Sequence, residues 1–464
     1  MAPLAMVGPL GIVAVSVLFI VAAIAFLRLP AFFALMMAAA LVALMASAGH
    51  GGNRFLEAIK ATTAAFGVAA GQFGFTIALA AVIGLSLMGS GAAEKIVRRM
   101  IAVLGENRAS IALLVCSFFL SAPVFVDTVF MLLLPLACAL SVRTRKDYLL
   151  NILAVTCGGM ITNGTVPPAP GPLAVAELIK VNLGAAIVAG ALFGIIPAIF
   201  ALAGARWFND RMQIAPRAAA GSSAESLAAL AERPESELPG FWVSIAPVFI
   251  PFALIAIAST LGLVHASTGR LQTAFEVLGE RNVALLIGAT IAVAVHARQK
   301  KLGWRRAGTV LGTPLEAAGV IILMVSAGSA YGAMIKQTGL GDAVRALVGG
   351  HAINYVLLAW AMSAAMRAAQ GSATVAMITG AGITVSVAGA AGFGVHPLYI
   401  LVAAGYGSKF LSWMNDAGFW VISRVSGLTQ GEALRSWSIL ACGVSLVGLI
   451  EVLIVSTIWP HLPF

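Results

Sequence analysis

Residues 109–141 read ASIALLVCSFFLSAPVFVDTVFMLLLPLACALS, an apolar stretch interrupted in its middle by a proline and an aspartate. A membrane-crossing helix needs about 20 residues, so this stretch is long for one crossing. One long tilted helix is the alternative, although mean tilts of about 20° do not easily absorb the length. Basic residues flank it on both sides: Lys95, Arg98, Arg99 and Arg108 before it, and Arg143, Arg145 and Lys146 after it. Because basic loops stay on the cytoplasmic side, the sequence predicts a re-entrant hairpin with its tip at Pro123–Asp127.

A second apolar stretch, 352–390, is also too long for one crossing and is interrupted at 367-RAAQGSAT-374. The polar segments 206–240 and 298–306 are rich in basic residues and are predicted to be cytoplasmic. Counting crossings from these segments places both ends of 352–390 outside, so this hairpin dips from the opposite face. In this threading, cytoplasmic segments hold 19 of the 28 Lys and Arg residues, which supports it.

The threading produces an internal repeat of opposite orientation. Three spans, a hairpin and two further spans occupy residues 9–205, and the same series occupies 241–459. We therefore expect a first inverted repeat at 1–205, a cytoplasmic linker at 206–240 and a second inverted repeat at 241–464. The predicted fold is an all-α polytopic membrane protein, in which each repeat has five transmembrane helices and one re-entrant hairpin, with broken helices at the midplane. Such repeats are typical of secondary transporters.

Composition agrees with a membrane protein. The 464 residues are 60% hydrophobic and 10% charged, with a mean hydropathy of +1.00, whereas soluble domains carry about 25% charged residues. The net charge of +10 fits the excess of basic residues in cytoplasmic loops better than nucleic-acid binding. We expect a multi-pass protein of the cell inner (plasma) membrane whose partners are the lipid bilayer and a small anionic substrate, and no nucleic acid.

Arg367 is the only Lys, Arg, Asp or Glu between His351 and Pro397. A lone arginine at bilayer depth costs about 2.5–3.5 kcal/mol on insertion scales, so it marks a functional position. Its planar fork matches a carboxylate, and Gln370, Ser372 and Thr374 add polar groups beside it. The sequence thus predicts an anion site here. The alternative is a structural ion pair with Asp127 or Asp416, and both hold if the arginine changes partner during a transport cycle.

Two more interruptions, 158-GGMITNGTVPPAPGP-172 and 405-GYGSKFLSWMNDAGFW-420, are dense in Gly and Pro. Helices unwind at such positions, and the helix N-termini that result favour anions. We expect Asn163, Thr165 and Asn415 to contact the substrate there.

The intramembrane acids Asp127 and Asp416 are predicted to carry the coupling ion. A buried carboxyl can bind and release a proton, whereas Asp416 with Asn163, Asn415 and backbone carbonyls could instead hold sodium. Lys409 could snorkel or contact the substrate, but we expect it to pair with Asp416. We expect no cofactor and no resident metal, only a co-transported proton, with sodium as the alternative.

At these motifs the chain resembles the gluconate permease family of gluconate:proton symporters. The matching stretches are APVFVDTVFMLLLPLA (122–137), VPPAPGPLAVA (166–176), AAQGSATVAM (368–377) and WMNDAGFWVISR (413–424). The resemblance implies an elevator-like cycle in a homodimer, with the family's acid after PVF at Asp127, its arginine at Arg367 and its NDxGFW carboxylate at Asp416. Many members carry a histidine near the proline-rich segment, where this chain has Asn163 and Ala169, so the resemblance leaves the substrate open.

The resulting hypothesis is proton symport of gluconate or a similar sugar-acid monocarboxylate into the cell. The alternative is a sodium- or proton-coupled carrier for another small carboxylate or a hydroxy amino acid. An enzyme is disfavoured because the sequence has no HExxH, no GxSxG with partners and no adjacent acid pair. A channel is disfavoured because the two hairpin tips differ in sequence and charge.

Overall fold

The structure is a computed structural model that describes residues 8–25, 27, 29–46, 53–123, 126–144, 146–215, 234–264, 270–303, 308–340, 343, 353–389, 392–414 and 416–462. Within these residues it is helical and contains no strand. The first half contains α1 (Pro9–Ala25), α2 (Ala31–Ala46), α3 (Arg54–Ser90), α4 (Ala92–Leu104), α5 (Ala109–Leu120), α6 (Val126–Thr144), α7 (Tyr148–Thr165), α8 (Pro170–Leu178), α9 (Leu183–Leu192) and α10 (Ile195–Met212). The second half contains α12 (Phe241–Val264), α13 (Arg270–Leu278), α14 (Arg281–Gln299), α16 (Gly312–Lys336), α18 (Tyr355–Gln370), α19 (Ala373–Ala388), α20 (Pro397–Gly407), α21 (Ala417–Ser426), α22 (Gln430–Ala433), a π-helical turn (Leu434–Ser438) and α23 (Ile439–Ile458). Short 3₁₀ turns lie at Glu106–Arg108, Glu235–Glu237 and Gly308–Leu311.

Seven segments of the described chain are helical, long and apolar enough to cross a membrane. Their outward faces carry large exposed apolar side chains, among them Ile199, Phe249, Val320 and Ile450. In water such a surface would be unfavourable, whereas lipid tails are as apolar as these side chains. The chain is therefore a multi-pass, all-α membrane protein, as its composition predicted.

Both stretches predicted as hairpins are broken inside the predicted motifs. α5 ends at Leu120 and α6 begins at Val126, while α18 and α19 are separated only by Gly371 and Ser372. Gly371 adopts a φ of 76°, in the left-handed region that glycine enters without a Cβ penalty. α18 and α19 pack tightly on each other, whereas α5 and α6 both pack on α7.

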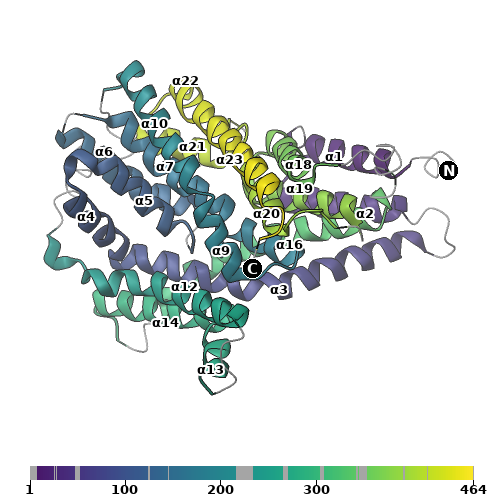
Figure 1. Cartoon of the computed structure of the whole chain (residues 1–464), viewed down its shortest axis with the longest axis horizontal. Helices are drawn as coiled ribbons and strands as arrows, with labels where there is room; N and C mark the ends of the chain where they lie inside the picture. Colours follow the sequence, from purple (N-terminus) through teal and green to yellow (C-terminus); the bar gives the residue numbers. More distant parts are fainter. Residues whose placement is uncertain are drawn as a thin grey trace.

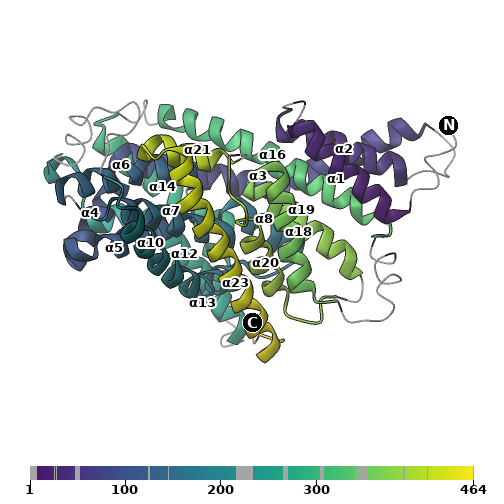
Figure 2. The ribbon, with the colours of Figure 1, turned by 90° about the horizontal axis from the view of Figure 1, so that it is seen from above.

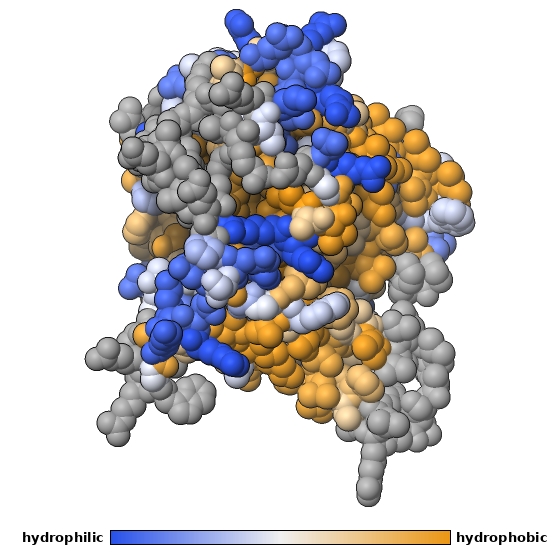
Figure 3. Space-filling view, turned by 90° about the vertical axis from the view of Figure 1, so that its left-hand side faces the viewer, coloured by the Kyte–Doolittle hydropathy of each residue, from blue (hydrophilic) through white to orange (hydrophobic). Residues whose placement is uncertain are grey.

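Several helix ends that the sequence assigned to the cytoplasm lie at one end of the molecule. Toward the left of Figure 1 lie the start of α5, the end of α6, the end of α10, the start of α12 and the end of α14. Figure 3 views this end and shows hydrophilic side chains gathered between apolar surfaces. Exposed residues here include Lys146, Asp147, Arg298 and Lys300. This clustering is what the basic-loop argument requires.

The centre of the molecule is built from the interrupted helices of both halves. α5 packs on α7 as α18 packs on α20, α8 packs on α19 as α21 packs on α6, and α7 contacts α20 directly. Figure 2 shows α8, α18, α19 and α20 side by side near the middle, with α23 running beside α20. The core therefore joins segments far apart in the sequence.

Two helices run further than the apolar segments suggested. α3 begins at Arg54 rather than near 66, because Asn53 caps it by accepting a hydrogen bond from the Leu56 N–H. Its 37 residues span about 56 Å, so the helix outruns an apolar bilayer core of about 30 Å. α10 continues to Met212, inside the predicted linker, whose residues 216–233 lie outside the described part of the chain.

The short amphipathic helix α4 links the first half to the end of this linker. Its Lys95 forms an ion pair with Glu235, and the Lys95 ammonium lowers the pKa of that exposed carboxyl. Arg98 pairs with Glu94 one turn earlier at 2.6 Å, which neutralises a nearly buried acid. In α4, Lys95 and Arg98 are thus paired with acids, while Ala92, Ala93, Ile96 and Val97 are buried.

Candidate functional site

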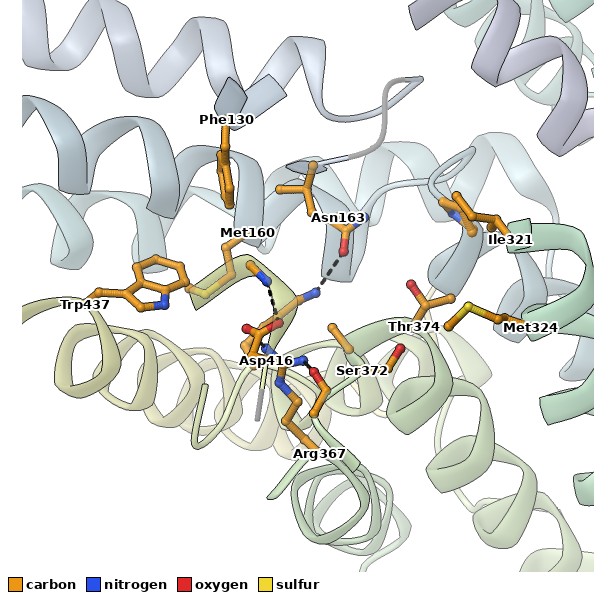
Figure 4. Close-up of a pocket in the computed structure, with 16 residues that line it drawn as sticks. Phe130, Met160, Asn163, Ile321, Met324, Arg367, Ser372, Thr374, Asp416 and Trp437 are labelled. Atoms are coloured by element: carbon orange, nitrogen blue, oxygen red, sulfur yellow. Dashed lines mark hydrogen bonds and ion pairs between the residues drawn. The ribbon is translucent and has the colours of Figure 1, made fainter. Parts of the chain in front are cut away.

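A cavity of about 360 Å³ lies where the interrupted helices meet. Small-molecule sites usually measure about 300–1,000 Å³, so this cavity suits a small ligand. It is lined by residues of both halves: Val126, Phe130, Met160, Asn163, Pro170, Ile321, Met324, Arg367, Gly371, Ser372, Ala373, Thr374, Lys409, Asp416, Gly418 and Trp437. Figure 4 shows how their side chains converge.

The N-terminal ends of four helices border this cavity. Val126 and Pro170 are the first residues of α6 and α8, Ser372 caps α19 and Asp416 caps α21. The first-turn N–H groups of a helix have no partner within the helix, and the helix dipole gives that end a partial positive charge. Four such ends around one cavity favour an anionic ligand.

Arg367 is 4% exposed and is held by three partners at the cavity wall. Its guanidinium forms an ion pair with Asp416, donates to the Gly371 carbonyl oxygen, and donates to the Ser412 hydroxyl at 3.0 Å. The Ser412 hydroxyl in turn donates to Asp416, and the second Asp416 oxygen accepts the Gly418 N–H at 2.9 Å. This network ties the second hairpin to the break between α20 and α21.

Lys409, which is 3% exposed, provides a second cation in the same cavity. Its ammonium donates to the Asn163 side-chain oxygen at 3.1 Å, which links the α20–α21 break to the end of α7. The two helices can meet because a glycine lies in each: a Cβ on Gly405 would collide with the Gly164 carbonyl oxygen. The glycine pair thus brings Lys409 and Asn163 within hydrogen-bonding distance.

The rest of the cavity wall is apolar. Phe130, Met160 and Trp437 lie on one side in Figure 4, and Ile321 and Met324 of α16 lie on the other, with the polar groups between them. Charged and hydrogen-bonding groups are therefore concentrated in a central band. Such a cavity can orient a small ligand by its anionic group and its hydrogen-bonding groups.

Some of the site residues predicted from the sequence line the cavity and others do not. Five of them line the cavity: Asn163, Arg367, Ser372, Thr374 and Asp416. Thr165 does not line it; this residue is fully buried, and its hydroxyl donates to the Ile161 carbonyl of its own helix at 2.9 Å. Asn415 and the side chains of Asp127 and Gln370 lie outside the described part of the chain.

Sequence reasoning missed the apolar wall and favoured Asp416 as the partner of Lys409, whereas the Lys409 ammonium donates to Asn163. Phe130, Met160, Ile321, Met324 and Trp437 carry no distinguishing signal, because apolar side chains in a membrane protein face lipid, core or cavity alike. The proximity of Lys409 to a break rich in Gly was a usable signal, but its partner Asn163 is 246 residues away.

A multi-pass helical protein with a buried polar cavity between broken helices has the architecture of a secondary transporter. A family profile described as GntP family permease matches residues 8–458, so the chain belongs to this family. It is accordingly a multi-pass transporter of the inner membrane rather than an enzyme.

Relatives cover almost the whole chain. A Gnt-II system L-idonate transporter of Escherichia coli is 28% identical, and the alignment covers 97% of this chain and 99% of that protein. A gluconate permease of Pseudomonas aeruginosa is 29% identical, covering 86% of this chain and 88% of the other. The crystal structure of the YdaH transporter of Alcanivorax borkumensis has a similar fold, with a TM-score of 0.59 at 15% identity, covering 88% of this chain and 90% of that one.

Proposed function

We propose that this permease carries gluconate or a similar sugar-acid monocarboxylate into the cell by proton symport. The observation that carries the proposal is the charge of the cavity. Among its described lining residues, Arg367 and Lys409 are cationic and Asp416 is acidic, which leaves one positive charge, and four helix N-termini add to it. A buried excess of one charge is costly and is offset by one bound monoanion.

The nature of the relatives and the polar side chains of the cavity support a sugar acid. The relatives are named for gluconate and L-idonate, both acids with several hydroxyl groups. Ser372, Thr374 and Asn163 provide donors and acceptors for such hydroxyls in the central band. The substrate carboxylate would lie nearest to Arg367 and the N-terminus of α19.

Proton coupling is proposed to act through Asp416. While ionised, this carboxylate pairs with Arg367; when protonated, it loses the charge that holds the guanidinium. Arg367 is then available to a substrate carboxylate, so proton and substrate would bind together. Asp127, at the start of α6, is the second candidate for the coupling acid.

Alternating access is proposed to rest on two inverted repeats, 1–205 and 241–464, joined by the linker 206–240. The matching contacts in the two halves support this arrangement, since α8 packs on α19 as α21 packs on α6. Gly190 of α9 also lies against the Thr165 carbonyl, as Gly448 of α23 lies against the Tyr406 ring. The homodimer and the elevator-like cycle remain proposals from the family resemblance.

The experiment is uptake of labelled gluconate into proteoliposomes with an imposed gradient of either protons or sodium. The proposal predicts accumulation driven by an inward proton gradient at equal sodium on both sides. Accumulation that responds only to sodium would replace proton coupling by sodium coupling. No competition by gluconate, with uptake of another small carboxylate or of serine, would favour the alternative substrate class.

A further inference from the structure

Trp437 differs from two other tryptophans with described contacts. The indole N–H of Trp360 donates to the Ser445 hydroxyl at 3.0 Å, and that of Trp420 donates to the Met414 carbonyl at 2.8 Å. Trp437 is only 3% exposed, yet its Nε1 has no hydrogen-bond partner among the described residues. Buried indole N–H groups usually have a partner, so this one calls for an explanation.

The position of Trp437 supplies one, because the residue lines the cavity. It lies in the π-helical turn Leu434–Ser438, between α22 and α23. A π-helical turn inserts extra backbone into a helix, shifts the register of the side chains, and often occurs at functional sites. In Figure 4 Trp437 lies on the opposite side of Asp416 from Thr374.

We propose that the Trp437 indole N–H donates a hydrogen bond to a hydroxyl oxygen of the bound substrate and thereby selects acids oxygenated at that carbon. This inference rests on the proposed function. The carboxylate is held on the Arg367 side, so the hydroxyl that Trp437 contacts lies further along the substrate chain. Phe130 and Met160 line the same side and keep water from replacing that contact.

The test compares Trp437→Phe with wild-type protein, using gluconate and the series of deoxygluconates that each lack one hydroxyl. Wild-type protein should transport one of these deoxy acids with a KM about tenfold above that for gluconate, the effect of one lost hydrogen bond. Trp437→Phe should show the same rise with gluconate itself and no further rise with that deoxy acid. An unchanged KM for gluconate, or equal additional losses with every deoxy acid, would overturn the proposal.

Trp360→Phe is the matched control, since it removes an indole N–H that already has a protein partner outside the cavity lining. It should leave the ranking of the deoxy acids as in wild type. If Trp437→Phe does not fold, benzothienylalanine at position 437 replaces N–H by sulfur at nearly the same shape and gives the same comparison. If wild-type protein carries glycerate or serine but no gluconate, the proposed substrate class fails, and the pairs glycerate–lactate and serine–alanine then test Trp437.

Discussion

The breaks between α7 and α8 and between α20 and α21 occupy corresponding places in the two halves, but they differ in chemistry. The first, 166–169, is short and uncharged, whereas the second, 408–416, carries Lys409, Ser412 and Asp416. Both follow a helix that ends one or two residues after its crossing glycine, Gly164 or Gly405. The backbone arrangement is thus similar and the side chains are not.

This difference separates the construction of the cavity from its selectivity. Among the described lining residues, the charged ones all come from the second half, while the first half contributes Asn163 and the apolar wall at Val126, Phe130 and Met160. A similar backbone on both sides provides helix N-termini around the cavity. Because the charged side chains lie on one side of the cavity, an anion binds in one orientation.

The largest effect is expected from Arg367→Lys, which preserves the charge of the second half and removes the planar fork. A lysine ammonium cannot reproduce the planar fork that contacts Gly371, Ser412 and Asp416, nor bind a carboxylate in a bidentate manner. We expect kcat/KM for gluconate uptake to fall by about 100-fold or more, the result of losing two or three charge-assisted hydrogen bonds. Uptake by reconstituted protein measures this.

Arg424→Lys is the control for that variant, because Arg424 is exposed and stacks on Trp420 at 5.9 Å from the ring centre. It should transport at close to the wild-type rate. Normal uptake by Arg367→Lys would remove Arg367 from the substrate site and leave it a structural role.

Asp416→Asn tests whether the charge asymmetry also carries the coupling. Asparagine cannot take up or release a proton, so a pH gradient should no longer drive accumulation, while exchange of labelled for unlabelled substrate continues. Because the variant leaves Arg367 without its buried counter-ion, folded protein is measured first by size-exclusion chromatography. Accumulation at the wild-type level would rule out Asp416, and Asp127→Asn, in the first hairpin, is the matched variant.

Alanine substitution at Gly164 or Gly405 tests the close contact between α7 and α20. Gly405→Ala should reduce the yield of folded protein strongly, because its Cβ would collide with the rigid Gly164 carbonyl. Gly164→Ala should be milder, at a cost of about 1–3 kcal/mol of stability, since its Cβ meets the flexible Lys409 Cε at 2.6 Å and the Gly405 carbonyl oxygen only at 3.1 Å.

Gly319→Ala in α16 is the control, because no atom lies within 4 Å of the added Cβ. Thermal unfolding in detergent compares the three variants. Equal losses at Gly164 and Gly405 would show that the two sides of the crossing do not differ.

The smallest effect is expected from removing one hydroxyl. Thr374→Val should raise the KM for gluconate about 2- to 10-fold, because Thr374 lines the cavity and one neutral hydrogen bond is lost. Thr165→Val should leave the KM unchanged, since that hydroxyl bonds within its own helix. Reversal of this order would place the substrate nearer to α7 than to α19.

The broad fold followed from composition, segment length and charge. The membrane class, the helical content and the positions of all four breaks could be predicted, since apolar length and Gly or Pro density are local properties. Helix ends in polar sequence were harder to predict. α3 begins after the cap residue Asn53, and α10 continues to Met212, and hydropathy detects neither end.

Within the site, sequence alone determined that a buried arginine needs an anion, but it left the partner open between Asp127 and Asp416. In the structure Arg367 pairs with Asp416, 49 residues away, and Lys409 donates a hydrogen bond to Asn163, 246 residues away. Pairings over such separations depend on how the helices pack, which no local pattern encodes.

The sequence therefore shows directly which residues are charged or polar, and burial of these residues costs free energy. Only the tertiary structure decided which of the remaining residues, whose burial costs little free energy, face the cavity. Trp437, in a π-helical turn, lines the cavity, whereas Thr165 does not and its hydroxyl donates within its own helix. Apolar and singly hydroxylated side chains are stable in several environments, so packing geometry, rather than composition, sets their role.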